Sequence, residues 1–278
     1  MSQTVGDSGI AEILASLSLA EDIANGNPPE TALRAAWIAA RLLQARGESV
    51  ETMREAALVT LLRFLGCTAY SVEEAAVVDD DRNFKRVFGS GDPTDRFDLL
   101  RRGSTLGADD RLFTRLRYAA RTAIHGNSIF TGMVQAQCDT AEVLGAGLGL
   151  GPTMRLALQQ FFERVDGSGK PRGLVGNAIE LSARTASLAY AYQLHHESGG
   201  IETARAVIKQ RRASQLDARL VDELRRLAPE LEPILNQTSV WDDSLPFLQE
   251  CDITHTDRCA GAFADFADLK SRYTVGHS

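Results

Sequence analysis

One stretch of the chain narrowly limits what the chain can fold into. It runs from Phe161 to Leu174 with the sequence FFERVDGSGKPRGL, and it holds three glycines and one proline within seven residues. An apolar helical run precedes it, and a second helical pattern follows from residue 179. Glycine and proline at this density hold the backbone in dihedrals that a helix does not allow. The pattern therefore predicts a tight loop between two packed helices.

Most of the remaining chain repeats apolar residues at the spacing of an α-helix. Helices are predicted over 10–25, 31–46, 53–64, 128–148, 154–164, 179–195, 202–210 and 217–227, with another beginning near 112. Short helices and loops are expected over 79–107. Glycine and proline pairs mark the predicted helix ends, at 25–29, at 199–200 and at 229–233. No segment alternates apolar and polar residues as a strand does. The predicted fold class is all-α, with helices packed on helices.

Composition excludes several function classes. The chain has 278 residues, 44% of them hydrophobic, and 37 acidic against 30 basic residues give a formal charge of −7. This charge argues against binding nucleic acid through the region as a whole. No apolar run is long enough to span a membrane, and the first residues do not form a signal peptide. Four separated cysteines indicate neither a disulfide framework nor a zinc knuckle. We therefore expect a cytoplasmic protein with no membrane partner.

The loop resembles the signature of HD-GYP domains, which are phosphohydrolase relatives that cleave cyclic dinucleotides through a bound metal pair. The family pattern runs HHE-x-x-DGSGYP-x-GL and continues as IPLxARI. The matching residues here are Glu163, Asp166, Gly167, Ser168, Gly169, Pro171, Gly173, Leu174 and Arg184. Phe161 and Phe162 replace the two histidines, and Lys170 replaces the tyrosine. The resemblance implies a helical HD-domain bundle whose chemistry has been removed.

The other metal positions of the family can also be followed along the chain. By this resemblance they fall on Thr31, Arg63, Phe64, Gln137, Phe161, Phe162 and Tyr190, and the catalytic lysine falls on Cys67. None of the side chains at the seven metal positions is a usual ligand for a divalent cation. The resemblance thus predicts a catalytically inactive regulatory or sensory module, with no catalytic residue, no metal ligand and no cofactor.

Three alternatives remain open for the former active-site cavity. It can be collapsed and filled by aromatic side chains. It can be a pocket for a small anion or nucleotide, with Arg63, Glu163, Arg164, Asp166, Lys170, Arg184 and Tyr190 as candidate ligand-binding residues. It can also keep a rearranged metal site built from Glu163, Asp166 and histidines, which would make the chain an HD-type cyclic-dinucleotide phosphodiesterase. For Asp166 and Arg184, hydrogen bonds that only hold the loop are an equally direct interpretation.

The last fifteen residues resemble the opening of a second HD-GYP-like domain. The family sequence DLKSxYTxGHS matches from Asp268, and it stops at His277 and Ser278. We expect a degenerate HD-GYP-like domain over 1–240, followed over 241–278 by a helical linker and the truncated start of the second domain. The resemblance is to bacterial regulators with tandem HD domains, some with a LuxR-type helix-turn-helix. It implies a homodimer, and a downstream HD-GYP or helix-turn-helix domain in the full-length chain.

Overall fold

The computed structural model describes residues 5–63 and 131–248, apart from 133 and 144, with the side chains of 5–10 and 24 also excepted. Its first three helices are α1 (Val5–Ala24), α2 (Thr31–Ala45) and α3 (Val50–Leu62). Residues 131–147 are helical where described. Then follow α8 (Pro152–Gln159), the 3-10 turn η2 (Gly176–Ala178), α9 (Leu181–Gln210), α10 (Ala218–Leu235), α11 (Trp241–Ser244) and the 3-10 turn η3 (Leu245–Phe247). The described part contains isolated bridges but no strand, and the predicted all-α class is confirmed.

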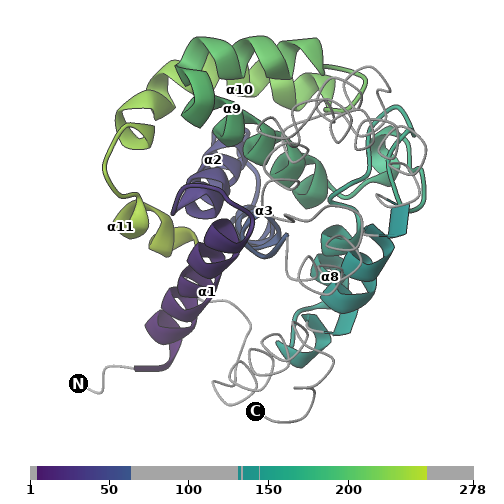
Figure 1. The fold of residues 1–278 in the computed structure, drawn as a ribbon, viewed down its shortest axis with the longest axis vertical. Helices are drawn as coiled ribbons and strands as arrows, with labels where there is room; N and C mark the ends of the chain where they lie inside the picture. The colour runs from purple at the N-terminus through teal and green to yellow at the C-terminus, as the bar shows by residue number, and fades with distance from the viewer. Residues whose placement is uncertain (1–4, 64–130, 133, 144, 249–278) are drawn as a thin grey trace, which may run out of the picture.

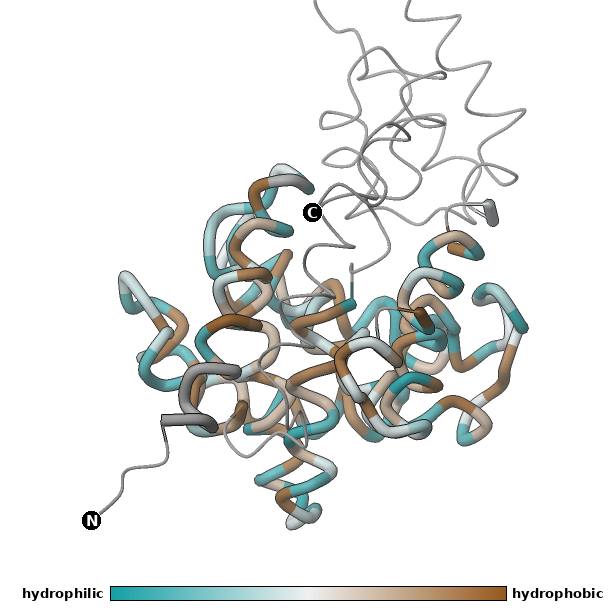
Figure 2. Tube along the Cα trace, turned by 90° about the horizontal axis from the view of Figure 1, so that it is seen from below, coloured by the Kyte–Doolittle hydropathy of each residue, from teal (hydrophilic) through white to brown (hydrophobic). Residues whose placement is uncertain are grey.

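The helices α2 and α3 form the centre of the molecule. Figure 1 shows them between α1 on one side and α9 and α10 on the other, with α8 beside the lower end of α9. Almost every side chain of α2 is buried, so this helix is surrounded by its neighbours. Colouring by hydropathy shows brown and teal residues interleaved along the helices, as expected for helices that each bury one face (Figure 2).

Two hydrophobic clusters share α2. The first joins α1, α2, α3 and α8 to the start of α9, and includes Phe161 and Tyr190. The second joins the other face of α2 to the later part of α9 and to α10, and includes Trp37 and Tyr192. The loop singled out in the sequence connects α8 to α9, so it lies at the edge of the first cluster. None of the described helices combines the length and the apolar character needed to cross a bilayer.

The predicted helices agree with the structure except that α1 begins five residues early, at Val5, and that the helix ends differ near three sets of glycines or prolines. The predicted helix over 154–164 ends at Gln159, five residues early, because the loop takes over the backbone there. The predicted helix end at 199–200 is a kink: Gly199 and Gly200 leave helical geometry, and α9 continues after them. The predictions over 79–107, from 112 and at 128–130 lie outside the described residues.

The prediction that α10 ends before its first proline is wrong. The helix runs to Leu235 through Pro229 and Pro233, both of which are exposed. Proline removes one helical hydrogen bond, but on the solvent side water can satisfy the carbonyl that is left. Leu231 and Leu235 are buried on the other side and hold the last turns against the core. Burial has therefore outweighed the local preference.

Candidate functional site

Glu163 holds the loop together from inside. Its side chain is buried, and its two carboxylate oxygens accept hydrogen bonds from the backbone N–H groups of Arg172, at 2.7 Å, and Leu174, at 2.9 Å. A carboxylate that bridges two backbone donors fixes the path of the chain between them. Both acceptor oxygens are engaged by the loop itself.

Asp166 and the glycines shape the exposed turn. Asp166 Oδ1 accepts from the backbone N–H of Ser168 at 2.9 Å and from its hydroxyl at 2.6 Å. Gly167 has a φ of 83°, which favours glycine. A Cβ at Gly169 would lie 2.2 Å from the backbone nitrogen of Arg164, so the loop closes on itself too tightly for any side chain there. These contacts support the structural interpretation of Asp166.

Arg184 ties the loop to α10. Its Nε donates to the backbone oxygen of Ile179 at 3.0 Å, and its Nη1 donates to Asn177 at 3.0 Å and to Asp217 at 2.5 Å. Asp217 is the N-cap of α10 and accepts from the backbone N–H groups of residues 219 and 220. This arginine therefore joins the end of the loop to the start of α10.

Arg63 occupies the place that the family pattern gives to a metal ligand, and it is enclosed by protein. Its side chain is fully buried, with Nη2 3.6 Å from Asp22 Oδ1 and the guanidinium carbon 3.9 Å from the centre of the Tyr190 ring. Its Nη1 donates to the backbone oxygen of Thr60 at 2.8 Å. Gln137 donates to the backbone oxygen of Arg63. The cation is thus held by a carboxylate, an aromatic face and a main-chain acceptor.

Some of the other positions mapped by the resemblance connect to Arg63, directly or through a neighbouring ring. Tyr190 contacts the guanidinium, and Phe161 packs edge-on against Tyr190 with ring centres 6.1 Å apart. Phe162 packs edge-on against Phe161 at 5.1 Å. Thr31 donates instead to Glu197 at 2.8 Å. Phe64 and Cys67 lie outside the described residues.

Sequence reasoning missed the carboxylates of α1. Glu21 is 3% exposed and Asp22 is 1% exposed, and both act electrostatically on Arg63. Asp22 Oδ2 also accepts from the backbone N–H of Ala32 at 3.0 Å. Burial raises the pKa of Asp22 to about 6, while Arg63 and that hydrogen bond oppose the rise. The sequence signal that could have identified them is a pair of adjacent acidic residues at the end of a mainly apolar helical run.

The structure does not bring the seven candidate ligand-binding residues into one cavity. Arg63 and Tyr190 are in contact inside the first cluster. Glu163, Asp166 and Arg184 make the loop contacts described above, and Arg164 and Lys170 are half-buried in the same loop. Within the described residues, no group of three or more His, Cys, Asp or Glu side chains is arranged to hold a metal ion. A ligand-binding role for the seven residues stays a prediction.

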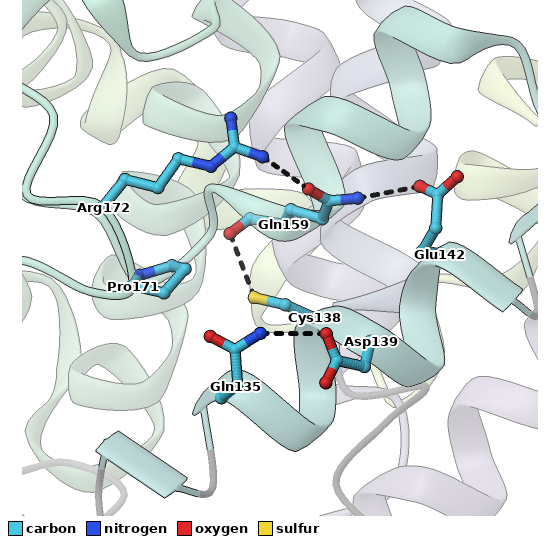
Figure 3. Close-up of a pocket in the computed structure, with 7 residues that line it drawn as sticks. All are labelled: Gln135, Cys138, Asp139, Glu142, Gln159, Pro171 and Arg172. Carbon is cyan, nitrogen blue, oxygen red and sulfur yellow. Dashed lines mark hydrogen bonds between the residues drawn. The ribbon is translucent and has the colours of Figure 1, made fainter.

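A pocket does lie on the outer side of the loop, between the helix of residues 131–147, the end of α8 and Pro171. Figure 3 shows its polar side chains satisfying one another: Arg172 and Glu142 both bond the side chain of Gln159, at 2.9 and 2.8 Å, and Gln135 bonds Asp139 at 2.9 Å. The Cys138 thiol donates to the backbone oxygen of Gln159. None of the seven predicted residues lines this pocket.

Comparison with known proteins connects this geometry to a family. No family model matches the chain. The 3'3'-cGAMP-specific phosphodiesterase 3 of Vibrio cholerae is 26% identical over 281 residues, covering 97% of this chain and 60% of that protein. The cyclic di-GMP phosphodiesterase response regulator RpfG of Xanthomonas campestris pv. campestris is 39% identical over 83 residues, or 28% of this chain and 22% of that protein.

A solved structure of a similar phosphodiesterase agrees with these sequence comparisons. The crystal structure of the cyclic GMP-AMP specific phosphodiesterase V-cGAP3 of V. cholerae matches with a TM-score of 0.71 and 22% identity, over 96% of this chain and 62% of that one. The fold is therefore the all-α fold of HD domains. The chain is similar to phosphodiesterases of the HD-GYP type, which confirms the predicted resemblance to HD-GYP and HD-domain phosphohydrolases. It spans about three fifths of the length of the V. cholerae relative. The tandem arrangement, the LuxR-type resemblance, the domain boundary at 240 and the partners stay predictions.

Proposed function

We propose that this chain works in the hydrolysis of a cyclic dinucleotide, as part of an HD-GYP-type phosphodiesterase. The names of both relatives, one specific for 3'3'-cGAMP and one for cyclic di-GMP, support this substrate class. They favour the predicted alternative, a cyclic-dinucleotide phosphodiesterase, over the main prediction of a catalytically inactive regulatory or sensory module. Conversion of the substrate needs a metal pair that activates water for attack on phosphorus.

Within that function, the HD-GYP-like bundle formed by the described residues acts as a regulatory part and leaves hydrolysis to other residues. The observation that carries this is the buried guanidinium of Arg63, held by Asp22 and Tyr190 where the family pattern has a metal ligand. A fixed positive charge there opposes the binding of a divalent cation. The neighbouring mapped positions carry an amide and aromatic rings, which are poor ligands for such a cation.

The test is a hydrolysis assay on the full chain with 3'3'-cGAMP and with cyclic di-GMP, each with manganese and with ferrous iron. The proposal expects no product from the chain alone, whichever metal is added. Product that disappears in Asp166→Ala but persists in Ser168→Ala would overturn the regulatory role. It would support instead a rearranged metal site in this chain, since Ser168 shares the same turn and is no metal ligand of the family.

A further inference from the structure

Glu21, at the end of α1, is buried, and the described residues offer it none of the contacts that a charged carboxylate needs. It is 3% exposed, and neither of its carboxyl oxygens has a hydrogen-bond partner among the described residues. Its neighbour Asp22 is bonded to the N–H of Ala32 and paired with Arg63. Burying an unpaired charge costs far more than burying a neutral acid. The folded chain therefore favours the protonated form of Glu21.

Among the described residues, the groups around this carboxyl leave no second cation to balance it. Arg63, at the end of α3, and Asp22 act electrostatically on Glu21, while Glu197 and Tyr190 of α9 interact with the neighbouring Asp22. On α2, Arg34 is directed away, since its guanidinium donates to main-chain oxygens at and after the end of α10. In the part of the chain that the structure describes, the guanidinium that acts on Glu21 is that of Arg63, which is already paired with Asp22. An ionised Glu21 would therefore add a negative charge that no described cation balances.

We propose that Glu21 is a proton-linked latch for α1: the end of the helix stays packed over Arg63 while this carboxyl holds its proton, and loosens when the proton is lost. Burial, as the largest cause, raises the pKa of Glu21 to about 8, with Arg63 opposing the rise and Asp22 adding to it. Proton loss therefore occurs close to neutral pH.

The end of α1 and the turn after it cover the Arg63 and Tyr190 pair. Asp22 contacts the guanidinium, and Asn27, in the turn before α2, donates to the Tyr190 hydroxyl at 3.3 Å. Loosening of this segment would remove both contacts and expose the guanidinium. The latch thus links proton binding to access to a cationic group at the position of the former metal site.

The first experiment is urea unfolding of the full chain as a function of pH. Because the pKa of Glu21 is higher in the folded state than its ordinary value of 4.5, the folded state holds an extra proton between these values. The unfolding equilibrium constant then rises with pH, approaching about tenfold per pH unit for one proton. Asp22 shifts in the same direction but only to about 6. A window from about pH 6.5 to about pH 7.5 therefore isolates Glu21.

Two variants sharpen this measurement. Glu21→Gln mimics the protonated acid, and Glu12→Gln removes an exposed carboxyl of the same helix. In wild type, Glu21 is expected to raise the unfolding equilibrium constant close to tenfold across the window. Glu21→Gln should lack this rise, and Glu12→Gln should keep it. The histidines contribute equally to the pH dependence of wild type and variants, so their effect cancels in the ratio of the unfolding equilibrium constants. Equal pH dependence in wild type and Glu21→Gln would overturn the proposal.

Hydrogen exchange of residues 11–24 in the wild-type chain tests the latch without a variant. After correction for intrinsic rates, protection of this segment is expected to fall across the same window relative to that of α2. If the protection of α1 does not change with pH, the proton on Glu21 does not control the packing of this helix, and the proposal is wrong.

Discussion

At the scale of single residues, the buried ion pair between Arg63 and Asp22 can be tested by removing its cation. Changing Arg63 to Met would leave Asp22 buried without its cation. We expect a loss of about 3 kcal/mol in the free energy of unfolding at pH 7, typical of a buried pair that loses one partner. The loss is expected to be smaller at pH 5, because the pKa of Asp22 is already about 6 and the neutral acid needs no cation. Urea unfolding at both pH values measures this.

The matched control for this variant is Arg155→Met, which removes a partly exposed pair with Glu142. It is expected to cost less than about 1 kcal/mol. Equal losses for the two variants, or a loss at Arg63 that does not depend on pH, would contradict the assignment of a buried Arg63 and Asp22 pair.

Gly169 provides an independent test at the residue scale. A Cβ there would lie within 2.6 Å of three backbone atoms of residues 163 and 164, and backbone cannot move aside as the end of a long side chain can. Gly169→Ala is therefore expected to destabilise the chain by about 2 to 3 kcal/mol. Ser168→Ala, at the exposed neighbour, should cost much less. Thermal or urea unfolding compares the two, and a Gly169→Ala variant as stable as wild type would contradict the loop geometry.

At the scale of elements, the N-terminus of α10 is joined to the loop through Asp217. Asp217→Ala removes the cap of the helix and the partner of Arg184, so a loss of about 1 to 2 kcal/mol is expected. Asp217→Asn keeps the cap and is expected to lose less. If both variants matched wild type in unfolding experiments, the link between loop and helix would be unimportant.

The same carboxyl has a defined pH dependence. Burial acts to raise the pKa of Asp217, but the N–H groups of α10 and the Arg184 guanidinium outweigh it, and the pKa is lowered below 3.8. The folded state therefore holds this proton less tightly than the unfolded chain does. Its contribution is fully present above pH 3.8 and is lost as the pH falls through the folded pKa. Asp217→Ala should therefore be less stable than wild type at neutral pH. A variant as stable as wild type there would show that the carboxylate makes no such contribution.

The helices were predictable where apolar spacing and glycine agree, and not where they conflict. The loop after Phe161 was predicted from glycine and proline density, which acts locally. The continuation of α10 through Pro229 was not, because burial of Leu231 and Leu235 depends on α2 and α9, which no local pattern reports. Propensity is a weak guide wherever tertiary packing opposes it.

At the scale of the whole molecule, the family resemblance gave what local patterns could not. The resemblance assigned Arg63, Gln137, Phe161 and Tyr190 to a common site. In the structure these four residues form one connected cluster of contacts. The carboxylates of α1 were missed, because Asp22 meets Arg63 only after the chain has folded over forty intervening residues. The spacing of residues along a sequence predicts contacts within one helix, but not contacts between two separate helices such as α1 and α3.

The most direct test of the central claim, that protein groups fill the former metal position, is the metal content of the purified full chain. The chain is incubated with iron, manganese and zinc, excess metal is removed, and each element is quantified. We expect less than about a tenth of an equivalent of each metal, because a buried guanidinium, an amide and aromatic rings cannot replace carboxylate and imidazole ligands. About one or two tightly held equivalents would contradict it and would make this chain itself a candidate metal-dependent phosphodiesterase.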